Sequence, residues 1–494
     1  MTHALQRMGA RLRESTVPVD FAFVDHVEQV EHAESPMAYR DRLPGVIVGL
    51  DGSLRNPRGA SAAARIAWAA TGMPATTALA ARLGAKRADA ALGGAGLRIG
   101  VSLVLEPKTA AFARVLADAG CAVAVFSAVS ETDPEIAAEL ARDERIAVFA
   151  PTAAVADTAL EIDAAHAAAI LDWSPDLLID DGAHLVRLAH TERPAAVATL
   201  LGAAEETTSG VRPVREMAAL DELRIPVIAV NDARTKTDFD NRIGTGQSCV
   251  FAIADVLDGA APRPYAGIAG SRWAVIGYGP VGQGVAQFAA ALGAEIVVIE
   301  QDPVRALLAI HDGYEAAPGA SALPNADVVV SATGVWHTLG SEAMATLRDG
   351  AVVAVAGGID DEIALDDMRS AGWSMREIGP GIAAWRGPGT ESVHGVRVLA
   401  AGGGINYTAG EGNPIEVMDL SFATQIAALM RLLETSPAPG VHLLSAADEH
   451  LVAEAALTAR GGGVDPASNS ARAGGAAQPW RVHRYRAAGR PETP

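Results

Sequence analysis

The chain has 494 residues and a mass of 50.6 kDa, and half of its residues are hydrophobic, which is enough apolar material for two or three domains with buried cores. Its formal charge is −20, from 39 basic and 59 acidic side chains, so we expect neither a nucleic-acid partner nor binding to an anionic membrane. Two cysteines, no continuous apolar segment near the N-terminus and no run of about 20 uncharged apolar residues predict a soluble cytoplasmic protein without disulfides.

Predicted strands and helices alternate along most of the chain. Residues 1–60 form a charged extension that contains one short apolar run, 44–50. The later runs that we expect to be helices or strands lie at 66–84, 97–105, 109–120, 122–128, 175–186, 225–233 and 414–434. Strands that alternate with helices of 10–15 residues are typical of parallel α/β sheets, whose ligands bind beyond the carboxyl ends of the strands.

A glycine-rich run after a predicted strand indicates a dinucleotide site. In SRWAVIGYGPVGQG, Gly277 permits a tight turn, Gly279 lets the backbone approach a pyrophosphate, and Gly282 lets the following helix pack on the strand. Pro280 and Val281 lie at the start of that helix, where free N–H groups favour an anion. Glu300 ends the next predicted strand and would bind the ribose hydroxyls, so we expect NAD rather than NADP. A purely structural glycine-rich turn is the alternative.

A second run, AVNDARTKTDFDNRIGTGQS at 229–248, brings together Lys236, Asp240 and Asn241 if it is helical. The simplest interpretation is a surface ion pair between residues i and i+4, which contributes only a few tenths of a kcal/mol. A lysine beside a nicotinamide ring instead indicates alcohol oxidation, with the lysine accepting the hydroxyl proton.

These two runs resemble the S-adenosylhomocysteine hydrolase family, whose hallmark VNDSVTKxxFDN precedes GYGxVGKG. Two more segments carry the resemblance: AAEETTSG at 203–210 is similar to SEETTTG, and LIDDGAHL at 178–185 is similar to LDDGGDL. The resemblance implies that NAD oxidises C3′ of a nucleoside ribose, after which a carboxylate removes the C4′ proton and the 5′ substituent leaves. Water then adds and the ketone is reduced again.

The resemblance also implies a role for each residue. Lys236, oriented by Asp240 and Asn241, would accept the 3′-hydroxyl proton, which requires burial or a positive neighbour to lower its pKa. Asp181 would handle the C4′ proton, and Glu206 would bind the ribose hydroxyls. The residues implied at the cofactor are Thr207, Thr208, Ser209, Arg305, Gly357 and, in a C-terminal tail that would reach a neighbouring subunit, Tyr485. Arg305 replaces a family asparagine and would soften the preference for NAD.

Several substrate motifs differ from the family pattern. The family's HMTxET reads VLEPKT here, so Val104 replaces a histidine, while Glu106 and Lys108 form either a new substrate-reading pair or a solvent-facing pair on a loop. The histidine of NIGHFD becomes Gly358, and the family cysteine becomes Thr245. His184 and His337 are candidate replacements for the lost histidines, or are simply solvated. Asn413, in place of the histidine of GHP, is expected at the substrate site.

The domains implied are an extension (1–60), a substrate-binding α/β domain (61–245, completed by 405–435), an NAD-binding Rossmann domain (246–404) and a C-terminal linker and tail (436–494). The predicted fold class is therefore α/β with two parallel-sheet, Rossmann-like domains. Two functions remain open: an NAD-dependent enzyme that oxidises C3′ of S-adenosylhomocysteine or a related nucleoside, or a catalytically silent relative that acts through a protein partner. We expect a nucleoside as small-molecule partner, a homo-oligomer (dimer or tetramer) and no metal.

Overall fold

The computed structural model describes residues 61–89, 96–152, 159–258, 267–357, 361–389 and 395–465. The chain divides into two compact units, Met1–Arg65 and Ile66–Pro494, and the features below belong to the second. The expected apolar run at 44–50, Gly358 and Tyr485 lie outside the described residues.

The first sheet of the described residues is parallel throughout. It has seven strands in the order β15-β6-β5-β4-β1-β2-β3. Their bounds are β1 (Arg98–Ser102), β2 (Ala122–Phe126), β3 (Ile146–Phe149), β4 (Leu177–Asp180), β5 (Gly202–Glu205), β6 (Pro226–Ala229) and β15 (Gly440–His442). The strand order reverses between β1 and β4, and in doubly wound sheets ligands bind at the carboxyl ends of such a pair.

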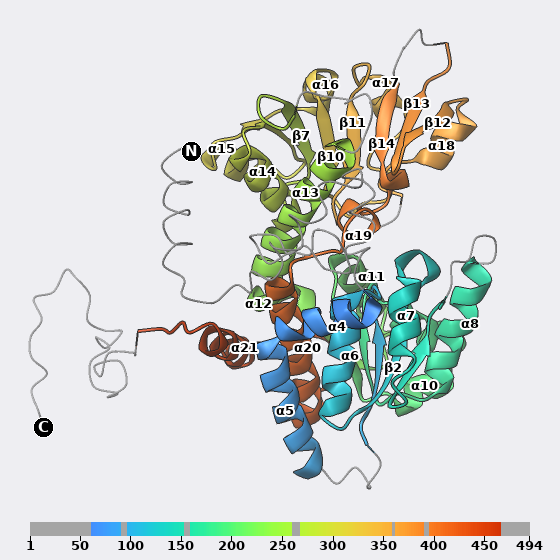
Figure 1. The fold of residues 1–494 in the computed structure, drawn as a ribbon, viewed down its shortest axis with the longest axis vertical. Coiled ribbons are helices and arrows are strands. Elements are labelled where there is room, and N and C mark those ends of the chain that lie inside the picture. The colour runs from blue at the N-terminus through green and yellow to red at the C-terminus, as the bar shows by residue number, and fades with distance from the viewer. Residues whose placement is uncertain are drawn as a thin grey trace, which may run out of the picture. The chain divides into compact units, whose positions relative to one another are not determined.

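Helices pack around this sheet, and long helix α20 runs beside α5 (Figure 1). Pro74 begins α5, so the single helix expected over 66–84 is in fact two, because proline favours the first turn of a helix and interrupts a longer one. The helices are α4 (Ala62–Thr71), α5 (Pro74–Asp89), α6 (Pro107–Asp118), η2 (Val129–Glu131), α7 (Pro134–Leu140), α8 (Ala159–Asp172), α9 (His184–Glu192), α10 (Pro194–Thr199), α11 (Thr208–Ala219), η3 (Val230–Asp232), α12 (Arg234–Lys236), η4 (Thr237–Gly244), α20 (Ile415–Thr435) and α21 (Ala446–Ala459).

The segment after 435 is not only a linker, which corrects our expectation for 436–494. Residues 440–442 form β15, which pairs in parallel with β6 at the sheet edge. Helix α21 follows, and its Ser445 and Asp448 form a capping box. The short strand was missed because three residues give too little alternation to recognise.

The second sheet of the described residues has eight strands in the order β12-β13-β14-β11-β10-β7-β8-β9. The expected parallel sheet is mixed at one edge, because β13 pairs antiparallel with both β12 and β14. The strands are β7 (Arg272–Ile276), β8 (Glu295–Ile299), β9 (Glu315–Ala316), β10 (Val328–Ser331), β11 (Val352–Val355), β12 (Ser374–Gly379), β13 (Ile382–Arg386) and β14 (Val396–Leu399). From β14 to β9 this is the Rossmann order, which reverses between β7 and β10.

The central strands of this sheet are apolar over most of their length because both faces are covered. Trp273 and Val275 belong to one core cluster, while Ala274 and Ile276 belong to the other. The covering helices and turns are α13 (Thr245–Asp258), α14 (Pro280–Ala291), α15 (Pro303–His311), α16 (Gly319–Ala322), η5 (Leu323–Asn325), α17 (Ser341–Ala345), α18 (Leu365–Ser370), η6 (Ala400–Gly402) and α19 (Ile405–Thr408). The resulting architecture is α/β with two Rossmann-like sheets, as predicted.

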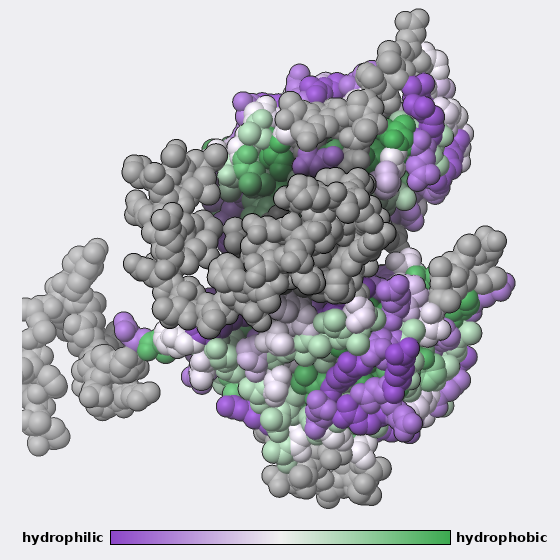
Figure 2. Space-filling view, in the orientation of Figure 1, coloured by the Kyte–Doolittle hydropathy of each residue, from purple (hydrophilic) through white to green (hydrophobic). Residues whose placement is uncertain are grey.

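Hydrophilic side chains gather over α6 and α7 on the face seen in Figure 2. Ion pairs here join Arg114 and Arg142 to Glu139, and Arg145 to Asp118. Both signs of charge are therefore interspersed on this face. No helix among the described ranges has the length and apolar character needed to cross a bilayer.

Two glycines let helix α14, which follows β7, pack closely against η4, the π-helix that follows Lys236. A Cβ on Gly284 of α14 would lie 1.8 Å from the carbonyl oxygen of Arg242 in η4, and a Cβ on Gly246 of α13 would lie 2.5 Å from the backbone of Gly284. The backbones touch directly, so nothing larger than hydrogen fits.

Gly284→Ala should therefore lower the free energy of unfolding by about 1–3 kcal/mol, the usual cost of overpacking. Urea denaturation would measure the loss. Gly340→Ala is the matched control, because its Cβ would meet no atom within 4 Å. Equal stability of the two variants would contradict the backbone contact.

Candidate functional site

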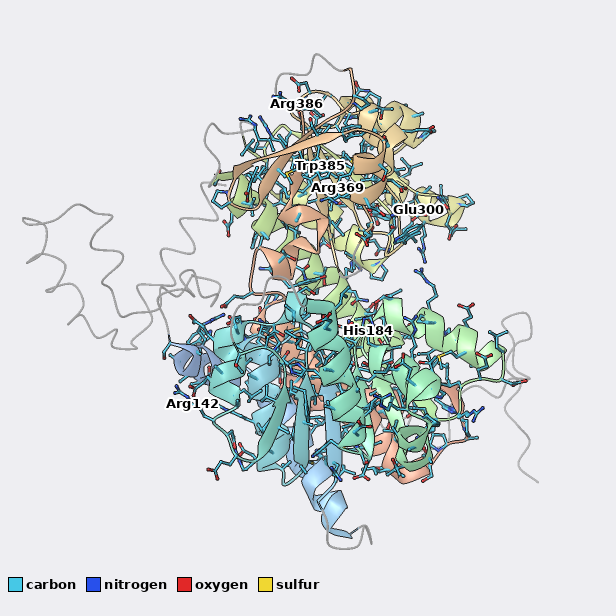
Figure 3. The ribbon with its side chains drawn as sticks, turned by 90° about the vertical axis from the view of Figure 1, so that its right-hand side faces the viewer. Arg142, His184, Glu300, Arg369, Trp385 and Arg386 are labelled. Carbon is cyan, nitrogen blue, oxygen red and sulfur yellow. The ribbon has the colours of Figure 1, made fainter. Side chains whose placement is uncertain are left out.

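The residues after β1 and β4 face one large cavity of about 1000 Å³. Glu106 and Lys108 follow β1, and Asp181 follows β4, so these predicted residues meet at the reversal point of the first sheet. The glycine-rich turn after β7 faces the same cavity. Figure 3 labels His184 and Glu300 on its two sides.

Most of the predicted site residues line this cavity. They are Glu106, Lys108, Asp181, Glu206, Thr207, Thr208, Ser209, Lys236, Asp240, Asn241, Gly277, Gly279, Pro280, Val281, Glu300, Arg305, Gly357 and Asn413. Gly282 instead lies behind the glycine-rich turn, where a Cβ would be 2.0 Å from the oxygen of Gly277. Its role is thus packing, as the glycine pattern predicts.

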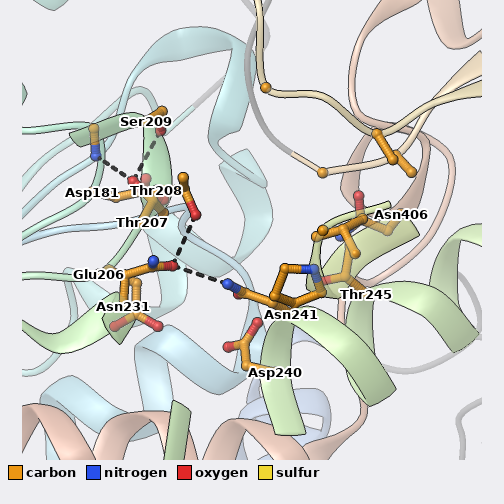
Figure 4. A pocket seen from close by; sticks show the side chains of 18 of the residues that line it. Asp181, Glu206, Thr207, Thr208, Ser209, Asn231, Asp240, Asn241, Thr245 and Asn406 are labelled. Atoms are coloured by element: carbon orange, nitrogen blue, oxygen red, sulfur yellow. Dashed lines mark hydrogen bonds between the residues drawn. The ribbon is translucent and has the colours of Figure 1, made fainter. Parts of the chain in front are cut away.

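Lys236 is buried and bound by side chains of the π-helix η4. Its Nζ donates to Asn241 Oδ1 at 2.8 Å and lies 3.5 Å from Asp240 Oδ1. The wide turn of a π-helix, a form often found at functional sites, brings residue i+5 next to residue i. The three residues therefore lie together in a helical run, as we expected, and that helix has the π form. Figure 4 shows Asp240 and Asn241 in this cluster.

We expected the pKa of Lys236 to be lowered, but in the structure it is raised. Burial lowers it, but the carboxylates of Asp240, Glu206 and Asp181 together outweigh burial and raise the pKa above the usual value. Lys236 is therefore an ammonium group held by acids. Its use as a base requires that a neighbouring carboxylate take its proton.

Glu206 is that neighbour, with Oε1 3.7 Å from Lys236 Nζ. The hydroxyl of Ser421 and the amide of Gln425, both on α20, donate to its two oxygens. Burial raises the pKa of Glu206 to about 7, although Lys236 and the two donors act in the opposite direction. A carboxyl group with this pKa can exchange a proton near neutral pH.

Asp181 is half-buried at the start of a tight turn. Burial raises the pKa of its carboxyl group, while a hydrogen bond from Thr207 and the charges of Lys236 and His184 oppose this. The next residues, Gly182 and Ala183, have φ values of 73° and 54°. Their left-handed conformation turns the chain away and leaves Asp181 facing the cavity.

Asn413 connects Asp240 to helix α13. Its Nδ2 lies 2.9 Å from Asp240 Oδ1 and 3.0 Å from Thr245 Oγ1, and its Oδ1 accepts from Ser248 at 2.9 Å. Asn413 thus holds the acid that contacts Lys236. Asn413 also lines the cavity, so its place at the substrate site stays a prediction.

Glu106 and Lys108 form a close pair rather than a solvent-facing pair on a loop. Lys108 is 5% exposed, and its Nζ lies 2.7 Å from Glu106 Oε2. Glu106 caps α6 by accepting from the N–H groups of Lys108 and Thr109. Lys108 also donates to the carbonyl oxygen of Glu411.

The two candidate histidines line the same cavity. His184 is exposed at the start of α9. His337 has its ring nitrogens 3.2 Å from Asp367 and 3.3 Å from Asp366. These three side chains could offer ligand atoms to a cation, but both acids are highly exposed and such groups commonly bind none, so the expected absence of a metal stays a prediction.

The turn after β7 fits a dinucleotide. Gly277 has a φ of 90°, and a Cβ on Gly279 would meet only the guanidinium of Arg305, at 3.8 Å, so the space beyond Gly279 is open. Gly279 caps the 12-residue helix α14 without any side-chain hydrogen bond. The first N–H groups of α14 remain available to phosphate oxygens.

Glu300 directly follows β8, beside this turn, and is held by the backbone. It accepts hydrogen bonds from the N–H groups of Tyr278, Gln301 and Asp302, at 2.7, 2.7 and 3.0 Å. Arg305, whose Nε is 3.8 Å from Asp302, lies at the same rim. A fixed carboxylate here suits ribose hydroxyls and repels a 2′-phosphate.

Other functional residues gave no clear signal in the sequence. Asn231 accepts from Asn241 and Thr208, so it links the lysine cluster to the threonine run. Glu362 accepts from Ser331, Thr333 and the N–H of Gly334, and so fixes the loop after β10. Only the position of Asn231 inside the hallmark run could have indicated its role.

Comparisons with known proteins agree with this geometry. Residues 249–412 match the family described as S-adenosyl-L-homocysteine hydrolase, NAD binding domain. An adenosylhomocysteinase of Thermotoga maritima is 37% identical over 76% of this chain and 90% of its own. An S-inosyl-L-homocysteine hydrolase of Methanosarcina mazei is 38% identical over 70% of this chain and 81% of its own.

Among solved structures, a phosphoglycerate oxidoreductase of Vibrio cholerae matches with a TM-score of 0.38 and 11% identity over 69% of this chain and 99% of its own, a likeness too weak to support an inference. The relatives are decisive, because they share more than a third of their residues with this chain over most of their length. The chain binds NAD and belongs to the S-adenosyl-L-homocysteine hydrolase family.

Proposed function

We propose that the protein is an NAD-dependent hydrolase of a homocysteine nucleoside whose base is a 6-oxopurine, as in S-inosylhomocysteine. The main support is one cavity that contains the lysine–carboxylate cluster, the glycine-rich turn and the Glu106–Lys108 pair. NAD, when bound, supplies an acceptor for the hydride of a secondary alcohol.

In this proposal, Lys236 handles the proton of the 3′-hydroxyl. Glu206, which also binds the ribose, takes the proton of the Lys236 ammonium once the two groups, 3.7 Å apart here, approach to hydrogen-bond distance, and the neutral amine then accepts the hydroxyl proton. In the reverse direction the ammonium returns a proton to the 3′-oxygen. Asn241 and Asp240 fix Nζ so that its position does not change between the two steps.

Asp181 acts on the neighbouring carbon. Oxidation at C3′ makes the C4′ hydrogen acidic, and the half-buried Asp181 carboxylate accepts it. Asp181 then returns the proton after the 5′ substituent has been replaced by water. Burial suits this role, because it raises the pKa of Asp181 toward the pH at which the protein works.

The preference for a 6-oxopurine rests on Glu106 and Lys108. Hypoxanthine offers an acceptor at O6 and a donor at N1, whereas adenine has these roles reversed. The two hydrogen bonds of Lys108 use two of its three ammonium hydrogens, and the third can bind O6. Glu106 can accept from N1–H. An S-inosylhomocysteine hydrolase among the relatives supports this choice.

Replacing Glu300 by alanine should weaken NAD binding and remove the discrimination against NADP. The physical reason is the loss of a fixed acceptor for the ribose hydroxyls and of its repulsion of a 2′-phosphate. Dissociation constants of both cofactors, measured by calorimetry, test this. Tighter binding of NADP than NAD to the unaltered protein would contradict the role of Glu300.

Lys108→Met should lower kcat/KM for S-inosylhomocysteine by about 10–100-fold, the value of a hydrogen bond to a charged group, and should spare S-adenosylhomocysteine. Steady-state kinetics with both nucleosides measure the ratio. Arg187→Met is the control, since Arg187 also lines the cavity but is exposed. A wild-type protein that prefers the adenosine compound would refute the proposed base.

Two substitutions should distinguish the oxidation at C3′ from the removal of the C4′ proton. With NAD-loaded protein and S-inosylhomocysteine, Lys236→Ala should abolish both reduced-nicotinamide absorbance and exchange of the C4′ hydrogen with deuterium. Asp181→Asn should keep the absorbance and lower the exchange by about 10²–10⁴-fold. A wild-type protein that shows neither signal with any homocysteine nucleoside would instead favour a catalytically silent relative.

A further inference from the structure

Glu205 is a completely buried acid that the steps above do not use. It ends β5, directly before the ribose-binding Glu206. Its Oε1 accepts from the N–H of Gly182 at 3.1 Å and from the N–H and hydroxyl of Thr207, each at 3.0 Å. Its Oε2 accepts from the N–H of Ala183 at 2.9 Å. Four donors thus converge on one side chain.

Two of these donors belong to the turn that contains Asp181. Gly182 and Ala183 both have left-handed backbones, and for an alanine this conformation is unfavourable unless the surroundings fix it. Glu205 provides that fixation from behind the turn. If Glu205 withdrew, the N–H of Ala183 would lose its buried acceptor, and the N–H of Gly182 would keep only the hydroxyl oxygen of Thr207.

Helix α11 packs against the other side of the Glu205 carboxyl group. A Cβ on Gly210 of α11 would lie 2.1 Å from Glu205 Oε1, so the helix backbone packs directly against the carboxyl group. Thr207 completes the enclosure: its hydroxyl oxygen accepts from the N–H groups of Gly182 and Gly210 and lies 2.9 Å from Ser209 Oγ. Figure 4 shows Thr207 and Ser209 beside Asp181.

We propose that Glu205 is a positioning residue for Asp181, because it holds, through Gly182, Ala183 and Thr207, the turn that presents the Asp181 carboxylate to the substrate's C4′. This proposal rests on the proposed function for the role of Asp181, but the hydrogen bonds on which it depends do not involve the substrate.

Glu205 also affects the charge around Asp181. Burial, followed by the charges of Asp180 and Asp181, raises the pKa of Glu205 well above its usual value, although hydrogen bonds from Thr207 oppose the shift. The carboxyl groups of Glu205 and Asp181 therefore interact, and the ionised form of each disfavours ionisation of the other. The other charged groups that face Asp181 are Lys236, His184 and Asp240.

Glu205→Gln tests the proposal, because glutamine keeps the shape but replaces Oε2 by an NH₂ group that cannot accept from Ala183. In the NAD-loaded full-length variant, C4′ deuterium exchange should fall by about 10–100-fold, as expected for a displaced catalytic group. Nicotinamide reduction should stay within about twofold of wild type. Deuterium exchange of backbone amides, followed by mass spectrometry, should show lower protection at 180–186.

Asp419→Asn is the matched control. Asp419 is also completely buried and accepts backbone hydrogen bonds, from Ala75 and Thr76, but it does not contact the Asp181 turn. It should leave the ratio of the two signals unchanged. If Glu205→Gln does not fold, Gly210→Ala displaces the same carboxyl group from the other side and should lower C4′ exchange selectively.

A folded Glu205→Gln variant with wild-type C4′ exchange would overturn the proposal, as would an equal loss of reduction and exchange. If wild-type protein shows neither signal, the proposed function fails and amide protection decides alone. Unchanged protection at 180–186 would then refute the positioning role, and reduced protection confined to that turn would support it.

Discussion

The burial of one ammonium group constrains the whole site. Lys236 is 3% exposed, and a charge in that position is tolerated only when it is paired and hydrogen-bonded. Its partners come from β5, through Glu206, and from η4, through Asp240 and Asn241. Each partner is in turn bound by a side chain from a more distant segment. The candidate site is therefore built around the stabilisation of this one charge.

This cluster lies at a cavity that is lined by residues from both sheets. The first sheet reverses its strand order between β1 and β4, and the second between β7 and β10. Residues after each reversal point line the same cavity. Gly284 lets the helix after the glycine-rich turn contact the backbone of η4, so the helix expected to bind the cofactor phosphates touches the turn that contains the lysine's partners.

Motifs with local geometry were predictable from sequence. Gly282 and Glu300 could be recognised because the role of each depends on few neighbours. A side chain at Gly282 would collide with the glycine-rich turn before it, and Glu300 comes where a predicted strand ends. The alternation of apolar runs likewise predicted both sheets. It did not predict β15, which is too short to show a pattern.

Features that depend on distant segments were not predictable. Ser421 and Gln425 bind Glu206 across more than 200 residues of sequence, and no local pattern marks them. The direction of the Lys236 pKa depends on the balance between burial and three carboxylates, which only the folded structure determines. The π-helix that brings Asn241 to Lys236 also has no known sequence signal here. Glu205 was overlooked because its neighbour Glu206 carried the family resemblance.

Oxidation of a nucleoside at C3′ is the chemistry that we propose for this site. The most direct measurement uses S-inosylhomocysteine with deuterium at C3′, mixed with NAD-loaded protein for less than one turnover, followed by mass spectrometry of the released dinucleotide. We expect the reduced nicotinamide to contain the deuterium. Turnover of the nucleoside with no deuterium in the dinucleotide would contradict it.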